Sequence, residues 1–294
     1  MSPRTRGVLL VACAGLLWST LGLGVRLMEE ASAWQIVFYR GLFQALAVTG
    51  WVLHRHRGGV LEAFHSIGWA GVVAAIGLGT AYNGMIVALS LTSVATVVFV
   101  LGATPFVTGV LAWWLLRERV HPATGVAMAI ALSGIAVMTF GGSGAGHGLG
   151  ILAAGVAVLG NAVFAVALRY GRAVDMLPSV ALAGIVAALL SAPWVNSLTL
   201  TPRDLALCAY LGGFALAVGL ALFTAGSRSL SAVELPLLAM TESVLAPIWV
   251  WALLGEEAGA ATLVGGALVL GAVLFQAMLG DPAGARGERA VAEP

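Results

Sequence analysis

Residues 7–26, GVLLVACAGLLWSTLGLGVR, and residues 150–169, GILAAGVAVLGNAVFAVALR, align without a gap. The two stretches lie 143 residues apart, and Gly, Leu, Ala and Arg recur in register, as Arg26 and Arg169 illustrate. Each stretch has about 20 residues, the length of a helix that crosses a bilayer. A repeated apolar helix predicts a duplicated membrane domain, an arrangement that recurs in small-molecule transporters.

The composition places the whole chain in a membrane. It is 60% hydrophobic and 9% charged, with a mean hydropathy of +1.01, whereas soluble domains average about 25% charged residues. No apolar segment alternates with polar residues as a barrel strand would. We therefore predict an all-α polytopic membrane protein with ten transmembrane helices of about 20 residues, at 7–25, 33–53, 67–90, 93–115, 122–141, 149–168, 178–199, 204–226, 230–254 and 258–279.

The arginines predict the orientation. The chain has no lysine, so all 14 basic residues are arginine. If the N-terminus is cytoplasmic, the opposite loops hold only Arg26 and Arg203, Arg40 lies inside a span, and all the others lie on the cytoplasmic side. Such an excess is typical of cytoplasmic loops. It predicts a multi-pass protein of the bacterial-type inner (plasma) membrane with both termini in the cytoplasm. A cleaved signal is the weaker alternative, since the first apolar run has a mid-chain copy.

The duplication continues beyond the first helix, because 91–94 recurs as 230–233 and 115–118 as 253–256. Five spans per half is an odd number, so the second half must enter the membrane from the opposite side. This predicts two inverted five-helix repeats. The predicted domains are a first repeat at 1–141, a Gly-rich linker at 142–148, a second repeat at 149–280 and a disordered cytoplasmic tail at 281–294.

Several motifs resemble a known family. They are FYRGL at 38–42, ATP at 103–105 and LAWWLLRER at 111–119, with a second copy from Glu242 to Glu256. Over residues 6–280 the chain resembles the EamA type of the drug/metabolite transporter superfamily and is similar to bacterial exporters of amino acids and related metabolites. It departs at Ser243, where the family usually has proline. The resemblance implies efflux through a central cavity lined by spans 1, 3, 4, 6, 8 and 9.

Three prolines interrupt two of the predicted spans. Pro105 lies in the fourth span, and Pro236 and Pro247 lie in the ninth. Proline removes a backbone hydrogen bond and bends a helix. Paired breaks in corresponding helices of two repeats are typical of a binding site, so we predict that these prolines act as hinges.

Polar and aromatic residues gather near the middle of the predicted spans. Polar groups in hydrocarbon are costly unless they face inward, so we predict that this layer binds substrate, although each polar residue could instead make an interhelical hydrogen bond. The aromatic residues could equally pack in the core or face lipid. The predicted substrate-binding residues are Trp18, Ser19, Tyr82, Asn83, Phe99, Thr104, Asn161, Phe164, Phe214, Thr241 and Glu242.

Two charges stand out within the spans. Glu242 could contact a substrate amino group, titrate during transport or hydrogen-bond a neighbouring helix. Arg40 could meet a substrate carboxylate, although we predict a structural charge. No metal site and no cofactor is expected, because the histidines lie outside the spans or at their edges.

These features predict a secondary transporter that exports small metabolites, amino acids first and aromatic or other apolar ones among them, by alternating access around a midplane cavity. The alternative is a multidrug exporter of lipophilic cations. A membrane-embedded enzyme is a different class, disfavoured because no nucleophile–base pair or phosphate-binding loop is found. The expected partners are a small-molecule substrate and the lipid bilayer, with no nucleic acid, and the expected working unit is a monomer.

Overall fold

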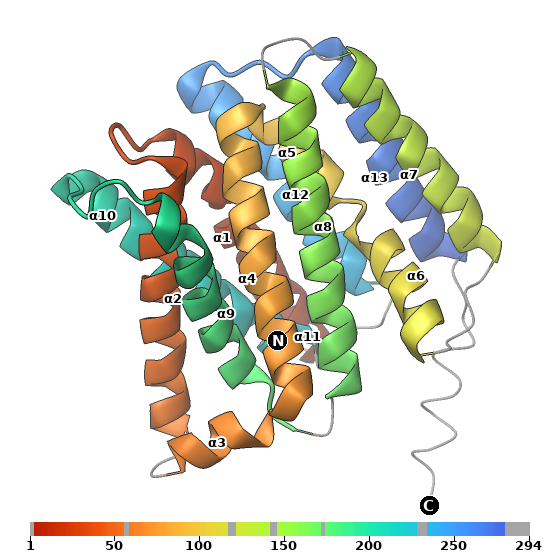
Figure 1. Ribbon diagram of the computed structural model, residues 1–294. Helices are drawn as coiled ribbons and strands as arrows, with labels where there is room; N and C mark the ends of the chain where they lie inside the picture. The colour runs from red at the N-terminus through yellow and green to blue at the C-terminus, as the bar shows by residue number, and fades with distance from the viewer. Residues whose placement is uncertain are drawn as a thin grey trace, which may run out of the picture.

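The computed structural model describes residues 3–55, 59–116, 122–141, 146–171, 174–227 and 234–279, and their regular structure is entirely helical. Figure 1 shows long helices running side by side, joined by short connections at both ends. The predicted tail at 281–294 and most of the predicted linker lie outside the described residues. The elements are α1 Pro3–Arg26, α2 Ala33–Arg55, α3 Val60–Ser66, α4 Gly68–Leu91, α5 Val94–Leu101, α6 Thr104–Leu116, α7 Pro122–Gly141, α8 His147–Tyr170, α9 Leu177–Ser191, the 3₁₀-helix η1 Ala192–Trp194, α10 Pro202–Ala209, the π-helix η2 Tyr210–Leu216, α11 Ala217–Ser227, α12 Glu234–Leu254 and α13 Ala260–Leu279.

Within the described residues, seven helical segments are long and apolar enough to cross a membrane, and three shorter apolar helices accompany them. Large apolar side chains cover the outside of the helices; Leu46, Leu152 and Phe140, for example, are 69%, 68% and 88% exposed. A water-soluble surface rarely carries so much contiguous apolar area. The chain is therefore a multi-pass membrane protein. The seven long segments are Thr5–Arg26, Ala33–Arg55, Gly68–Leu91, Val94–Leu115, His147–Leu168, Leu177–Trp194 and Pro202–Phe223, and the shorter ones are Gly125–Gly141, Thr241–Leu254 and Ala260–Phe275.

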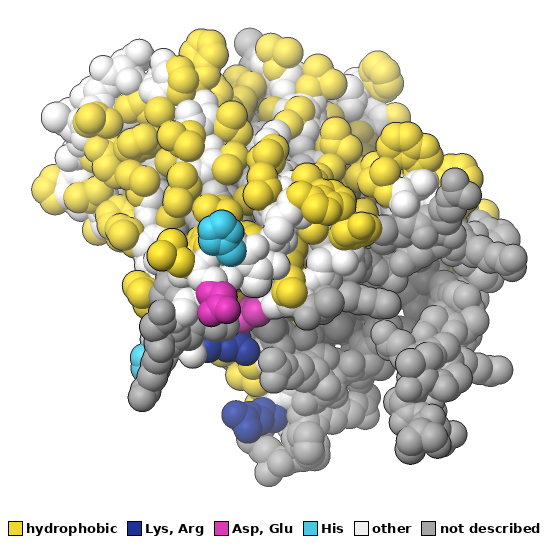
Figure 2. All heavy atoms as spheres, turned by 60° about the horizontal axis from the view of Figure 1, so that its bottom comes forward, with side chains coloured by type: hydrophobic (Ala, Val, Ile, Leu, Met, Phe, Trp, Pro, Cys, Tyr) yellow, Lys and Arg dark blue, Asp and Glu magenta, His cyan; other side chains and the backbone are white. Residues whose placement is uncertain are grey.

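The helices end on two sides of the molecule, the Arg26 end and the Arg55 end. The Arg26 end holds the end of α1 and the start of α2, and the Arg55 end holds the start of α1, the end of α2 and the short helix α3. Figure 2 looks toward the Arg55 end and shows charged and histidine side chains gathered there beside a broad apolar flank. Such a division is typical of a protein end that leaves the hydrocarbon for the polar interface.

Helix α9 ends earlier than the apolar pattern predicted. The span predicted at 178–199 stops being α-helical after Ser191 and continues only as one 3₁₀ turn. Pro193 lies within that turn, and proline cannot donate the hydrogen bond that would continue an α-helix. The chain beyond it is held from α2, where Gln35 Nε2 donates to the carbonyls of Ser197 and Thr199 at 2.8 and 3.1 Å.

The span predicted at 93–115 is divided into α5 and α6 by a break at Gly102 and Ala103. Pro105 follows this break and has no N–H to donate to the carbonyl of Leu101, its normal helical partner. The hydroxyl of Thr104 donates to that carbonyl instead, at 2.6 Å. The side chain therefore satisfies the acceptor that the proline leaves free, which allows an interrupted helix inside the bilayer.

Glycines let several helices approach closely. Helix α4 packs between α8 and α9, α2 packs against α9, and α7 packs against α13. A Cβ added to Gly41 would lie 2.5 Å from the carbonyl oxygen of Gly184, and a Cβ added to Gly184 would in turn meet the carbonyl oxygen of Gly41. Small residues at helix contacts are the usual means of close approach in membranes.

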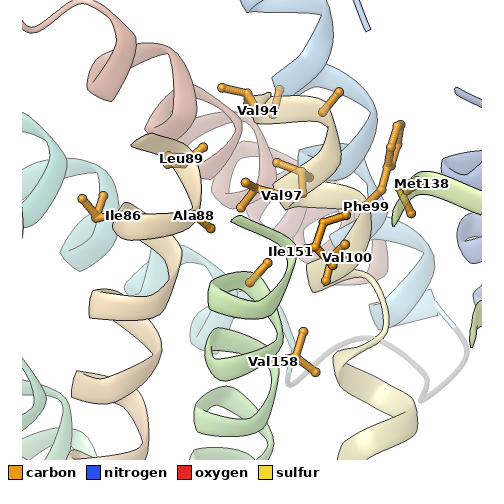
Figure 3. Close-up of a cluster of buried hydrophobic side chains, with 14 of the residues drawn as sticks. Ile86, Ala88, Leu89, Val94, Val97, Phe99, Val100, Met138, Ile151 and Val158 are labelled. Atoms are coloured by element: carbon orange, nitrogen blue, oxygen red, sulfur yellow. The ribbon is translucent and has the colours of Figure 1, made fainter. Parts of the chain in front are cut away.

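Figure 3 shows a cluster of fully buried side chains toward the Arg26 end, where α4, α5 and α8 meet. Ile86, Leu89, Val94 and Val97 are each 0% exposed. Side chains that are this completely buried are not accessible to water, so the helices are closely packed at this end.

Candidate functional site

A central cavity of about 380 Å³ lies among the helices. Its lining comes from α1, α4, α5, α6, α8, η2, α11 and α12, which correspond to the spans that the family resemblance implied, and also from α2, α9 and α13. The wall is mostly aliphatic, with a small number of polar groups that include Gln44, Tyr82, Asn161 and Glu242. An apolar pocket with a few convergent polar groups is the usual form of a small-molecule site.

The structure brings together six of the predicted substrate-binding residues and one predicted hinge. They come from five helices that are far apart in sequence, and each contributes to the cavity wall. These residues are Trp18, Tyr82, Thr104, Asn161, Phe164, Glu242 and Pro105.

Five predicted residues do not line the cavity. Ser19 is fully buried and receives a hydrogen bond from Trp249 Nε1 at 2.9 Å. Asn83 donates to the carbonyls of Gly79 and Ala187. The other three are Phe99, which packs against Gly266 in the core; Phe214, which is half exposed and stacks on Tyr210; and Thr241, which is absent from the lining.

The reason lies in helical geometry. Consecutive residues point about 100° apart around a helix. Ser19 follows Trp18, Asn83 follows Tyr82, and Thr241 precedes Glu242. One member of each pair faces the cavity and its neighbour is turned into a helix contact. The sequence predicts the depth of such residues better than the direction in which they point.

Two polar groups in the cavity wall lack partners. The carboxylate of Glu242 has no hydrogen-bond or ion-pair partner in the described part of the chain. The indole Nε1 of Trp18 is buried without a hydrogen-bond acceptor. An unpaired polar group inside a protein is costly, and a ligand with a donor for the carboxylate and an acceptor for the indole would relieve that cost.

A second cluster of polar side chains lies where α2 meets α4. Gln44 Nε2 donates both to the Tyr82 hydroxyl oxygen and to the carbonyl of Val180, each at 3.1 Å. The guanidinium of Arg40, whose residue is 1% exposed, lies 4.6 Å from the centroid of the Tyr82 ring. Arg40 Nη2 and Gln44 Oε1 are buried without a hydrogen-bond partner. Arg40 has no carboxylate partner among the described residues.

Irregular backbone adjoins the cavity on two further sides. Pro247 lies inside α12 and has no N–H for the carbonyl of Ser243, which lines the cavity next to Glu242. The π-helix η2 ends at Leu216, another lining residue, and π segments are frequent at functional sites. Pro236 lies in the first turn of α12, and its side chain is outside the described part of the structure.

A larger vestibule of about 1110 Å³ adjoins the cavity toward the Arg55 end. Trp18, Phe164 and Leu220 line both spaces, so the two are adjacent. Charged side chains stand at the mouth, where Arg55 Nη1 lies 3.5 Å from Asp175 Oδ2. The vestibule therefore lies on the side of the cavity that faces the Arg55 end.

The Arg26 end is closed by a hydrogen-bonded ion pair. Arg26 Nε lies 2.7 Å from Glu256 Oε2, and the other guanidinium nitrogens donate to the carbonyls of Leu89 and Thr92 at 2.8 and 2.7 Å. The second oxygen of Glu256 accepts from the backbone N–H of Val94 at 2.8 Å. Two charged side chains thus tie together the ends of α1, α4, α5 and α12 directly above the buried cluster.

Comparison with known proteins agrees with this architecture. The model of the EamA-like transporter family matches residues 5–140. The match covers slightly less than half of the chain, and this part is similar to the EamA-like transporter family. The resemblance to the drug/metabolite transporter superfamily that the motifs predicted is confirmed, and members of the EamA-like family are membrane transporters.

The fold is also similar to that of a protein of known crystal structure. The sequences are 23% identical, the TM-score is 0.64, and the alignment covers 94% of this chain and 98% of that chain. No curated protein matches the chain in sequence. At this identity the similarity bears on the fold alone, and it extends through both halves of the chain.

Sequence reasoning missed Gln44 as a lining residue, and the Arg26–Glu256 pair as a junction. Gln44 lies one helical turn after Arg40, in a span whose neighbouring residues are apolar. This spacing places both side chains on one face of α2, so the sequence alone could have indicated a polar face there. The ion pair joins residues 230 positions apart, and no local pattern predicts such a contact.

Proposed function

We propose that this protein is a secondary transporter that exports small zwitterionic metabolites, with amino acids as the first candidates. The observation that carries the proposal is the unpaired carboxylate of Glu242 in the wall of a mostly aliphatic central cavity. A carboxylate there favours a cargo with an amino group, and the apolar wall favours an apolar side chain. A volume of about 380 Å³ suits a small solute.

We also propose that ten helices cross the membrane as two inverted five-helix repeats, 1–141 and 149–280 joined by the linker 142–148. Gly41 and Gly184 are 143 residues apart, the same separation as the two repeated first helices, and each approaches the other's carbonyl. Reciprocal contacts are expected on a two-fold axis. The three shorter apolar helices complete the ten.

Transport in this proposal proceeds by alternating access. The vestibule at the Arg55 end supports a state open on that side, and the Arg26–Glu256 pair with the buried cluster beneath it supports a closed gate on the other. Opening the gate and closing the vestibule would carry the cavity across the membrane. The breaks at Pro105 and Pro247 supply places where backbone hydrogen bonds need not be broken for helices to bend.

The arginine distribution supports an inner-membrane orientation with both termini, and therefore the Arg55 end, in the cytoplasm. The vestibule would then be the entrance for a cytoplasmic cargo. A reporter that works only in the cytoplasm is expected to be active when it is fused after residue 280. A reporter that works only in the periplasm is expected to be inactive at the same position. Two fused halves already supply a pseudo-symmetric pair, so a monomer is the proposed working unit.

The test is transport by purified protein in liposomes. Labelled amino acids and lipophilic cations are compared at matched protein amounts, with and without a pH gradient, for the native chain and for Glu242→Gln. Amino-acid transport that falls at least tenfold in a well-folded Glu242→Gln variant supports the proposal. Equal transport rates and equal pH profiles for the native chain and Glu242→Gln would show that Glu242 has no role in transport. Transport of lipophilic cations alone would favour the multidrug exporter, which an unpaired carboxylate in an apolar cavity would also suit.

A further inference from the structure

We propose that Tyr82, oriented by Gln44 and backed by Arg40, forms a carboxylate-binding subsite in the central cavity. This inference rests on the proposed function, export of small solutes through that cavity, and it assigns an orientation to the cargo. The carboxylate of an amino acid meets Tyr82, and the ammonium group meets Glu242. Tyr82 contacts the cargo directly, and Arg40 acts through Tyr82.

The orientation of the Gln44 amide is determined by Val180. The carbonyl of Val180 can only accept a hydrogen bond, so the amide atom 3.1 Å from it must be the nitrogen, Nε2. The same nitrogen lies 3.1 Å from the Tyr82 hydroxyl oxygen and therefore donates to it. A flipped amide would place an oxygen against the Val180 carbonyl oxygen, so the hydrogen bond to Val180 would be replaced by a repulsive contact.

This arrangement leaves the Tyr82 hydroxyl proton free. The phenol oxygen accepts from Gln44, and no acceptor for its own proton is found among the described residues. Tyr82 also lines the cavity. Its O–H is therefore a donor available to a ligand, and a carboxylate oxygen is the strongest acceptor that a small metabolite offers to a neutral hydroxyl.

Arg40 gives this side of the cavity a positive charge. Its guanidinium is 4.6 Å from the Tyr82 ring centroid, is always protonated, and has no carboxylate partner within the described structure. A buried charge without a counter-charge is costly, and an anion that arrives nearby lowers that cost. The adjacent cation also stabilises negative charge that develops on the phenol oxygen when its proton is donated, which strengthens the hydrogen bond.

The opposite charge lies on another side of the cavity. Tyr82 belongs to α4, which packs against α8, α9 and α2, whereas Glu242 belongs to α12, which packs against α1, α5 and α13. The cavity therefore has a negative group in its wall and a positive charge behind its wall, and the two come from separate helix clusters. An amino acid carries both complementary charges, whereas a lipophilic cation satisfies only Glu242 and leaves Arg40 without a counter-charge.

The experiment compares three cargos in liposomes: a labelled apolar amino acid, its carboxamide and the corresponding decarboxylated amine. For the native protein the amino acid is expected to have a KM at least tenfold below that of either analogue, as a hydrogen bond to a charged group provides. Tyr82→Phe is expected to raise the KM of the amino acid to that of the analogues and to leave the KM of the amine unchanged.

Matched variants distinguish the loss of the carboxylate-binding subsite from a general loss of folding or activity. Tyr39→Phe removes a hydroxyl that bonds the carbonyl of Leu198, outside the cavity, and should leave the preference intact. Arg40→Lys keeps the charge behind the ring and should keep the preference even where thermal stability falls. Arg40→Gln should lose the preference in KM. Folding of each variant is checked by monodisperse elution and helical circular dichroism.

The outcomes are distinct. If the native protein transports the amino acid, carboxamide and amine with equal KM, or if folded Tyr82→Phe retains the preference, the subsite is overturned and export stands. If Arg40→Gln retains the preference, the backing role of Arg40 is overturned. If the native protein transports none of the three cargos, the proposed amino-acid export fails and the subsite fails with it.

Discussion

Charged side chains lie at both ends of the molecule, but they are arranged in opposite ways. At the Arg26 end, Arg26 and Glu256 are 28% and 23% exposed and are joined to three backbone groups. At the Arg55 end, Arg55 and Asp175 are 54% and 34% exposed, 3.5 Å apart, at the mouth of a vestibule. Partly buried pairs with additional hydrogen bonds stabilise a contact far more than exposed pairs do. The difference indicates which end is locked and which is open.

A single helix also contains one close contact and one exposed position. Gly41 of α2 touches the backbone of Gly184, whereas Gly50, on the exposed face of the same helix, has nothing within 4 Å of a Cβ position. One helix thus takes part in a tight contact and in an open one. The two positions allow the comparison to be tested by the same substitution.

The largest expected effect is that of Gly41→Ala. The added methyl group would meet the Gly184 carbonyl oxygen at 2.5 Å, so the helices must separate, and overpacking of this kind costs about 1–3 kcal/mol. Gly50→Ala is the matched control; it should be neutral or stabilise by up to about 1 kcal/mol through helix propensity. Unfolding in detergent measures both. Equal stability of the two variants would break the comparison.

Glu256→Gln should have an effect of comparable size. Glutamine keeps an acceptor for the Val94 N–H but loses the charge opposite Arg26, and a hydrogen bond to a charged group contributes about 1.5–3 kcal/mol. Glu29→Gln is its control, since Glu29 pairs with Arg203 at the same end but both side chains are more than half exposed. That change should stay below about 1 kcal/mol. A loss for Glu29→Gln as large as for Glu256→Gln would show that burial does not distinguish the pairs.

Arg55→Gln should have the smallest effect on stability. The ion pair with Asp175 is exposed and longer than a hydrogen bond, so the free energy of unfolding should change by less than about 0.5 kcal/mol. The measurement is the same detergent unfolding experiment, compared directly with Glu256→Gln. If Arg55→Gln destabilises the protein as strongly as Glu256→Gln, the Arg55 end is locked too.

Much of the fold could be predicted from the sequence, because a bilayer imposes helix length and apolar composition on every span. The positions of the long helices and the break near Pro105 followed from these constraints. The end of α9 at Ser191 was not predicted, although Pro193 in the sequence favours it, and the π-helix at Tyr210–Leu216 could not be predicted because it depends on packing against α2. An apolar run does not reveal such local departures.

The candidate site was partly predictable for a related reason. Counting along a span gives depth, and Trp18, Tyr82 and Glu242 all line the cavity. Rotation around the helix axis is set by packing with distant helices, so Ser19 and Asn83 were placed at the correct depth but face helix contacts. Long-range pairs such as Arg26 with Glu256 arise only in the folded chain.

The central claim, that the cavity is open only toward the Arg55 end when the Arg26 gate is intact, is tested most directly by labelling one cysteine from each side. Leu220 lines both the cavity and the vestibule. Leu220→Cys is made with Cys13→Ser and Cys208→Ala, since both native cysteines are free thiols. A membrane-impermeant maleimide should label it at least tenfold faster from the Arg55 side than from the Arg26 side, and Glu256→Gln should reduce that ratio. Equal labelling rates from both sides, in a protein whose gate is intact, would contradict the claim.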